Sequence, residues 1–241
     1  MQNFYQRLRT TYTGEEINAT ATYEDGSWTY DTETIEPTIL DNDRTGKQAV
    51  VLGNGASRND FDINYIFKQP KLQTYGCNAI HRDAHYDVDF LVINNDKIAQ
   101  ELIASGGATR KVVYANSDQI FEHPGVFYLM PQDPQWNAGA MAAYMAAFDG
   151  HKQVYLVGFD GQDTHGNNNN IYTGTNAYQI EDTVVTDDFY GLALKTLMQA
   201  YPLVEFVHVN KTGKGNIPSA WKDCPNFRRI SFHQLVTECD L

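Results

Sequence analysis

The stretch Ala49-Val50-Val51-Leu52-Gly53-Asn54-Gly55-Ala56-Ser57 decides the fold of this 241-residue chain. Four apolar residues in a row followed by glycine are typical of a strand buried on both faces of a parallel sheet. Glycine lets the turn that follows pass close to a phosphate, and Ser57 is a favourable N-cap for a helix over 57–67. We therefore expect a nucleotide-sized anion site at Gly53-Asn54-Gly55, where free N–H groups would face the ligand. Neither a P-loop lysine nor the third glycine of a dinucleotide fingerprint is present, because Arg58 stands at the third position.

Apolar runs and helical segments alternate through the rest of the chain. The expected strands are 72–76, 88–93, 111–114, 126–129, 153–157 and 204–209, and the expected helices are 57–67, 96–104, 138–148 and 187–201. Strands that alternate with helices predict a mostly parallel sheet with right-handed crossovers and helices on its faces. The sequence thus predicts an α/β, Rossmann-like domain over residues 47–241, with no internal repeat.

Residues 1–46 differ in composition, since they are rich in Thr, Tyr, Glu and Asp and poor in Leu and Val. The segments 20–23 and 28–30 flank Asp25-Gly26, a dipeptide that favours a tight hairpin turn. We expect an N-terminal β-hairpin arm here. It either packs on the main domain, the interpretation we rank first, or forms a contact in a homo-oligomer.

Charge and cysteine content restrict the function class. The formal net charge of −12 disfavours nucleic acids and anionic membranes as partners. Three widely spaced cysteines fit neither a disulfide scaffold nor a zinc site. No apolar stretch approaches 18 residues, and the N-terminus lacks the apolar core of a signal peptide. These features predict a cytoplasmic protein without a membrane span.

Small polar residues follow most of the expected strands. These turns are 53–57, 77–79, 94–96, 116–117 and 158–160, and all but the last contain asparagine. Ligands of open parallel sheets bind beyond the carboxyl ends of the strands, where such turns converge. The asparagine amide has donors and an acceptor, which suits recognition of a base or ribose. Asparagine is also an ordinary turn residue, so it is the agreement among several strand ends that favours a site.

The polar segment 161–179 is long for a connection in a compact α/β domain, and we expect it to form a lid. Tyr172 and Tyr178 within it are candidates to lie over a nucleotide and donate hydroxyls to phosphate. As general base we consider His165 in the lid, or a carboxylate such as Asp187 at the start of the last predicted helix.

Metal binding has weaker candidates. Asp87-Val88-Asp89 precedes a strand, on the wrong edge of the sheet for this site, and we interpret it as a strand-entry turn. Asp160 with Asp163 is better placed, and would matter only for chemistry that requires Mg²⁺. We therefore expect no metal in the main hypothesis.

Several motifs resemble one family. Val51–Ser57 resembles the Gly-Asn-Gly-Pro-Ser opening of bacterial sialyltransferases of glycosyltransferase family 42, and Cys77-Asn78 is similar to their Arg-Cys-Asn. Asn137–Gly139, an alanine-rich helix and then Val154–Asp160 are similar to their Thr-Ser-Gly, helix, Ile-Tyr-Leu-Ser-Gly-Ile-Asp. The resemblance covers residues 48–210 in the same order. Rossmann-like proteins of the archaeal pterin pyrophosphokinase type and of the flagellin-modification type share parts of it.

The resemblance implies a CMP-sugar site that needs no metal. It places Asn54 at phosphate or ribose, Asn78 at the nucleotide, Ala138-Gly139 at the cytidine end, Asp160 near the ribose and Tyr172 at phosphate. The substrate- or nucleotide-binding residues expected in all are Gly53, Asn54, Gly55, Ser57, Asn78, Asn94, Asn137, Ala138, Gly139, Gly158, Asp160 and Tyr172.

The chain also departs from the family. The second lid tyrosine falls near Gln162, the histidine proposed as base falls near Val185, and Ala138 replaces serine. The family also has no counterpart of the arm.

The function expected from these features is a sialyltransferase-like glycosyltransferase with a CMP-type donor and a glycan or small-molecule acceptor. Two alternatives remain open. One is a Mg²⁺-dependent enzyme of the pyrophosphokinase type, and the other is a non-catalytic nucleotide-binding protein on the same fold.

Overall fold

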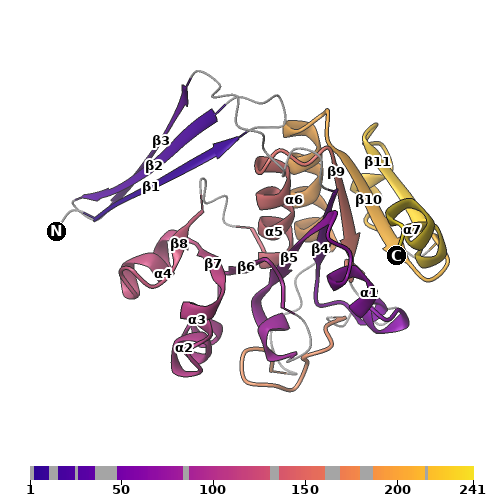
Figure 1. Ribbon diagram of the computed structural model, residues 1–241, viewed down its shortest axis with the longest axis horizontal. Coiled ribbons are helices and arrows are strands. Elements are labelled where there is room, and N and C mark those ends of the chain that lie inside the picture. The colour runs from indigo at the N-terminus through magenta and orange to yellow at the C-terminus, as the bar shows by residue number, and fades with distance from the viewer. Residues whose placement is uncertain are drawn as a thin grey trace.

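The apolar run before Gly53 forms strand β4 (Gln48–Leu52), near the middle of a parallel sheet (Figure 1). Within the described residues this sheet has eight strands in the order β11-β10-β9-β4-β5-β6-β7-β8, and each neighbouring pair is parallel. The other strands are β5 (Leu72–Cys77), β6 (Phe90–Ile93), β7 (Val112–Ala115), β8 (Tyr128–Leu129), β9 (Gln153–Val157), β10 (Glu205–Asn210) and β11 (Phe227–Ser231). The predicted Rossmann-like α/β fold is confirmed.

The structure is a computed structural model, and it describes residues 3–10, 16–24, 27–35, 48–83, 87–130, 136–160, 169–179, 187–214 and 217–241. For residues 3–10, 16–24, 27–35 and 187–190 it describes the backbone only, with the exception of exposed Thr29.

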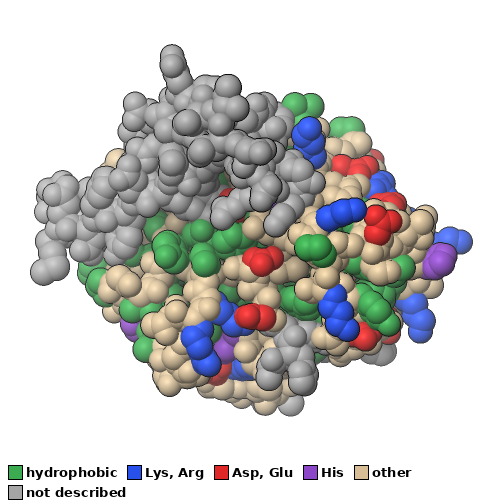
Figure 2. Space-filling model, viewed as in Figure 1, with side chains coloured by type: hydrophobic (Ala, Val, Ile, Leu, Met, Phe, Trp, Pro, Cys, Tyr) green, Lys and Arg blue, Asp and Glu red, His purple; other side chains and the backbone are tan. Residues whose placement is uncertain are grey.

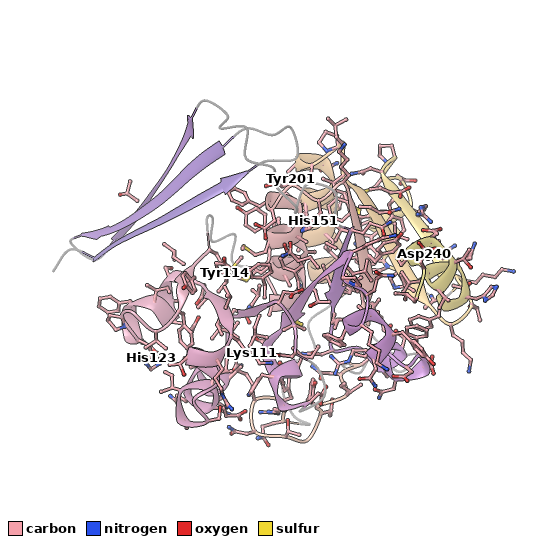
Figure 3. All side chains as sticks on the ribbon, in the orientation of Figure 1. Lys111, Tyr114, His123, His151, Tyr201 and Asp240 are labelled. Carbon is pink, nitrogen blue, oxygen red and sulfur yellow. The ribbon has the colours of Figure 1, made fainter. Side chains whose placement is uncertain are left out.

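Helices cover both faces of the sheet, with side chains packed between the helices and the strands (Figure 3). On one face lie α5 (Ala138–Phe148) and α6 (Asp187–Ala200), and on the other lie α1 (Asn64–Phe67), α2 (Asp96–Ala104), α3 (Gly107–Arg110), α4 (Ser117–Glu122) and α7 (Phe232–Cys239). Alternate strand residues face the two cores: Val51 packs in the core with α5, while Val50 and Leu52 pack in the other. Burial on both faces explains why this strand is apolar without alternation.

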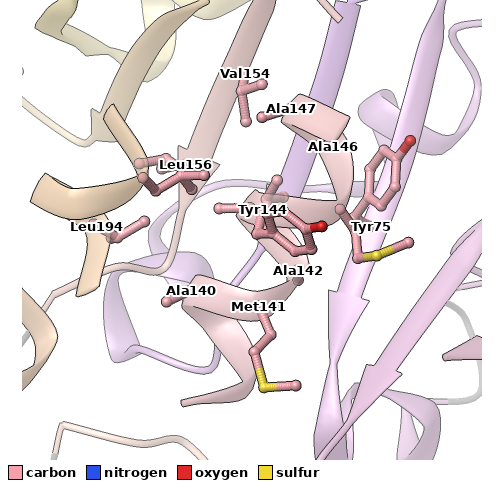
Figure 4. Close-up of a cluster of buried hydrophobic side chains, with 14 of the residues drawn as sticks. Tyr75, Ala140, Met141, Ala142, Tyr144, Ala146, Ala147, Val154, Leu156 and Leu194 are labelled. Carbon is pink, nitrogen blue, oxygen red and sulfur yellow. The ribbon is translucent and has the colours of Figure 1, made fainter. Parts of the chain in front are cut away.

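Helix α5 is almost entirely buried, and its small alanines let it approach the sheet closely. Figure 4 shows Tyr144 and Met141 of this helix among Val154, Leu156 and Tyr75 from the strands. The chain passes through α5 from the β8 edge back to β9, which pairs with β4. The order of the strands therefore reverses at β4 and β9, and ligands of open sheets bind beyond such a reversal point.

The described part of the N-terminal region forms a separate antiparallel sheet of β1 (Asn3–Thr10), β2 (Glu16–Glu24) and β3 (Ser27–Ile35). The predicted hairpin is confirmed, since β2 and β3 pair antiparallel and Glu24 pairs with Ser27. The first strand was not predicted.

Other predicted boundaries need correction. The helix expected over 57–67 is replaced by a 3-10 helix, η1 (Ala56–Asp60), and the short α1. The break has a local cause, because Phe61 is extended and the Asp62 carboxylate accepts from the Asn64 N–H at 3.1 Å. The third strand begins at Phe90 and not at residue 88, and β11 and α7 were not predicted at all.

On the face shown in Figure 2, Lys and Arg side chains alternate with Asp and Glu, without a continuous basic area among the described residues. No helix of the described part of the chain is long and apolar enough to cross a membrane.

Candidate functional site

A cavity of about 150 Å³ lies beyond the carboxyl ends of the central strands, at the reversal point between β4 and β9. It is lined by Gly53, Asn54, Gly55, Cys77, Asn78, Asn94, Asn137, Ala138, Gly139, Gly158, Phe159, Asp160, Asn169, Asn170 and Tyr178. All of the predicted binding residues except Ser57 and Tyr172 are in this lining. Segments far apart in the sequence therefore meet where the strand-end argument placed them.

Glycines after β4 and β9 allow these two strands to approach closely at the base of the cavity. The Gly53 N–H donates to the Val157 carbonyl at 2.8 Å, and the Gly55 N–H donates to the Gly158 carbonyl at 2.9 Å. A Cβ on Gly53 would lie 2.4 Å from the Gly158 carbonyl oxygen, and Gly158 itself has φ +76°. A larger residue at position 53 would therefore push β4 and β9 apart.

The glycine turn is not an open anion site. The Ser57 N–H donates to Asp160 Oδ2 at 2.7 Å, and the Ser57 hydroxyl donates to the other oxygen of the same carboxylate. The Ala56 N–H donates to Asn169 Oδ1 at 3.3 Å. The N-cap expectation for Ser57 was wrong, because Ser57 lies inside η1, whose N-cap is Gly55. Its N–H, expected to face a ligand, is paired with Asp160 in this structure.

Asn78 and Asn94 form a reciprocal amide pair between β5 and β6. Asn78 Nδ2 donates to Asn94 Oδ1, and the Asn94 N–H donates to Asn78 Oδ1, both at 3.1 Å. Asn94 Nδ2 donates in turn to the Trp136 carbonyl at 2.9 Å, next to the start of α5. Asn78 has φ +43°, a left-handed conformation that asparagine tolerates better than most residues. The pair fixes this wall of the cavity.

Asn137 caps α5 and has an unused donor. Its Oδ1 accepts from the Ala140 N–H at 3.0 Å, while its buried Nδ2 has no hydrogen-bond partner among the described residues. The Tyr178 hydroxyl is also buried without a bond of ordinary geometry, although the Asn78 side chain and the Ala79 N–H lie beside it. Unpaired buried polar groups are rare in proteins, so Asn137 Nδ2 marks a place where a ligand would bond.

Comparisons with family models, curated proteins and solved structures found no match to this chain. The geometry of the cavity is therefore the basis for the functional argument.

Tyr172 does not face the cavity. Its hydroxyl donates to the Asp83 carboxylate and accepts from Arg58 Nη2 at 2.7 Å, and the residue is 7% exposed. The Arg58 guanidinium also bonds Asp83 at 2.7 Å and the Gly53 carbonyl at 3.0 Å. Tyr172, expected at phosphate, instead anchors its segment to a buried arginine here, and Tyr178 is the tyrosine that lines the cavity.

The described part of the predicted lid, residues 169–179, is fastened beside the cavity. The Ile171 N–H donates to the Asn54 carbonyl at 2.9 Å. Arg82 Nη1 donates to the Thr175 hydroxyl at 2.6 Å, and the same guanidinium forms a bidentate pair with Glu101. Residues 169–179 are thus held both by the glycine turn and by Arg82, which pairs with Glu101 of α2.

Few ionisable groups line the described cavity. Burial raises the pKa of the Cys77 thiol to about 12, and burial likewise raises the pKa of Tyr178. Both groups are neutral near pH 7, which leaves Asp160 as the charged group of the described lining. His165 and Asp163 lie outside the described residues, and for Asp187 only the backbone at the start of α6 is described.

Other sequence candidates have structural roles. The Asp89 carboxylate accepts from the N–H and hydroxyl of Thr74 at the strand-entry edge, away from the cavity, as the sequence predicted. Asn95 and Asn116 cap α2 and α4. Within the described part of the chain, no group of three or more His, Cys, Asp or Glu residues is placed to hold a metal ion.

Sequence reasoning missed the contribution of several residues. Phe159, Asn169 and Asn170 line the cavity and were not named as binding residues. The run of asparagines at 167–170 was the available signal for the last two. Arg58 was noted only as a missing glycine, and nothing local in the sequence indicates that it is 2% exposed.

Proposed function

We propose that this protein is a transferase that binds a nucleotide-sugar donor of CMP type in the cavity at the β4/β9 reversal point, in the manner of the sialyltransferases it resembles. No metal is required for this chemistry, and a glycan or small molecule is the acceptor.

One observation supports the proposal above the others. Residues chosen as ligand contacts from separate strand ends and from the start of α5 line one cavity, and that cavity contains the unpaired Asn137 Nδ2 donor. A pyrimidine ring offers ring-nitrogen and carbonyl acceptors that suit an amide donor. The cavity volume of about 150 Å³ is below the roughly 300–1,000 Å³ of sites that enclose a whole ligand, so it would hold one moiety while the rest lies outside.

Calorimetric titration with CMP, CDP, UDP and GDP tests the proposal. We expect CMP to bind with a higher affinity than the purine nucleotide, because the enclosed volume favours the smaller ring. Absence of binding by all four at millimolar concentration would refute the proposal. Hydrolysis of a CMP-linked sugar, followed by release of CMP, then tests the transferase chemistry.

The Asn137→Asp variant locates the ligand. Aspartate keeps the oxygen that caps α5 but removes the amide donor, so folding should be retained while CMP affinity falls at least about tenfold. Asn95→Asp is the matched control, because the Asn95 side chain also caps a helix, α2, and lies outside the cavity lining. Equal affinity in the two variants would place the ligand elsewhere.

A second candidate function is nucleotide binding without transfer. It is favoured by the described lining, in which Cys77 and Tyr178 are neutral and Asp160 already accepts three hydrogen bonds. CMP binding without cleavage of a CMP-sugar, with a broad set of acceptors, would select this function.

A further inference from the structure

The carboxylate of Asp160 occupies the position that the glycine turn would otherwise offer to an anion. Oδ2 accepts from the Ser57 N–H at 2.7 Å and from Asn169 Nδ2 at 3.3 Å, and Oδ1 accepts from the Ser57 hydroxyl. A Cβ on Gly55 would lie 2.6 Å from Oδ2, so the carboxylate is in direct contact with the turn. The protein's own anion therefore binds the donors that a phosphate would use.

The arginine that follows the turn already has an anionic partner. The Arg58 guanidinium is paired with Asp83 at 2.7 Å and bonded to the Gly53 carbonyl at 3.0 Å. A phosphate that approached Ser57 would meet the negative charge of Asp160 at short range, in a partly buried place where like charges repel more strongly than in water.

We infer that Asp160 determines specificity in this cavity: it excludes phosphate from the glycine turn, so that this end accepts only an uncharged part of a ligand. The inference rests on the proposed function, because it says how a nucleotide-sugar bound in this cavity would be oriented by Asp160. The phosphate would then lie away from Gly53–Ser57, in contrast to what the sequence pattern predicts for such a turn.

Titration with inorganic phosphate, without any nucleotide, tests the inference. Asp160→Asn removes the charge and keeps the shape of the side chain, and we expect its phosphate affinity to exceed that of the unmodified protein by at least about tenfold. In ¹⁵N-labelled Asp160→Asn protein, the amide signal of Ser57 should move as phosphate is added. Asp89→Asn is the matched control. It also removes the charge of a carboxylate that accepts hydrogen bonds, here two from Thr74, but it lies at the opposite end of the strands. It should leave phosphate affinity unchanged.

Two results would overturn the inference. One is an Asp160→Asn variant that folds, by circular dichroism, and gains no phosphate affinity over the control. The other comes from the unmodified protein, and it applies even if the variant fails to fold: saturable movement of the Ser57 amide signal at millimolar phosphate would show that the carboxylate does not exclude the anion. Absence of that movement supports the inference. Failure of CMP to bind would instead count against the proposed function alone.

Discussion

Replacement of Arg58 by methionine tests how the buried arginine supports the site. The side chain is 2% exposed and links the Gly53 carbonyl, Asp83 and Tyr172, so it joins the glycine turn to the lid segment 169–179. Methionine has a similar length and fills most of the volume but makes none of these bonds. The expected effects are a loss of stability and a looser lid.

The size of the stability loss follows from these contacts. Removing one partner of a buried ion pair costs about 3–5 kcal/mol, but the Asp83 side chain is 29% exposed and can regain water, which lowers the cost. The methionine variant also avoids the burial of a charged group. We therefore expect the free energy of unfolding to fall by about 3 kcal/mol, and Arg58→Lys to lose nearly as much because lysine lacks the planar fork.

Urea unfolding and limited proteolysis measure the two effects. The Arg58 variant should be cleaved within residues 169–179 faster than the unmodified protein, because Tyr172 has lost its anchor. Arg228→Met is the control: Arg228 pairs with Glu205 and Glu238 away from the cavity and should leave this cleavage unchanged. A loss below about 1 kcal/mol, with unchanged cleavage, would refute the structural role of Arg58.

Three further outcomes are expected. Gly53→Ala should destabilise the protein by at least about 3 kcal/mol in urea unfolding, because its Cβ would lie 2.4 Å from the Gly158 carbonyl oxygen. Gly125→Ala has open space around it and should cost only about 1 kcal/mol, which comes from its φ of +78°. All three cysteines are buried, so alkylation by iodoacetamide should be slow in the native protein and rapid in urea, as mass spectrometry would show. The hydrogen bond from Arg228 lowers the pKa of Glu238 below its ordinary value. This pair therefore stabilises the fold above the ordinary pKa of glutamate, and the stabilisation should be lost as pH falls through the folded pKa. The change in thermal midpoint between neutral and acidic pH should thus be smaller in Glu238→Gln.

The central strands were predictable because each is buried on both faces and so consists of consecutive apolar residues. Strand β11, Phe-Arg-Arg-Ile-Ser over 227–231, lies at the edge of the sheet and is only partly buried, so it has no apolar run to detect. The helix expected over 57–67 was lost to a side-chain turn at Asp62, which propensity over a whole window does not resolve.

The location of the candidate site was predictable for a similar reason. Parallel strands bring their carboxyl ends to one edge, so the residues after them converge whatever their side chains do next. The partners of those side chains were not predictable. Ser57 bonds Asp160 across 103 residues, and Arg58 bonds Tyr172 across 114. No local sequence pattern specifies which pairs of distant polar residues will bond each other.

This difference changes where a ligand is expected within the cavity. At the glycine turn the N–H groups of Gly53, Gly55 and Ser57 are paired within the protein, so a ligand there must displace an existing bond. At the start of α5, Asn137 Nδ2 is buried and has no partner among the described residues, so a ligand that bonds it recovers a desolvation cost already incurred on folding. We therefore expect a ligand to gain more binding free energy at the start of α5 than at the turn that first indicated the site.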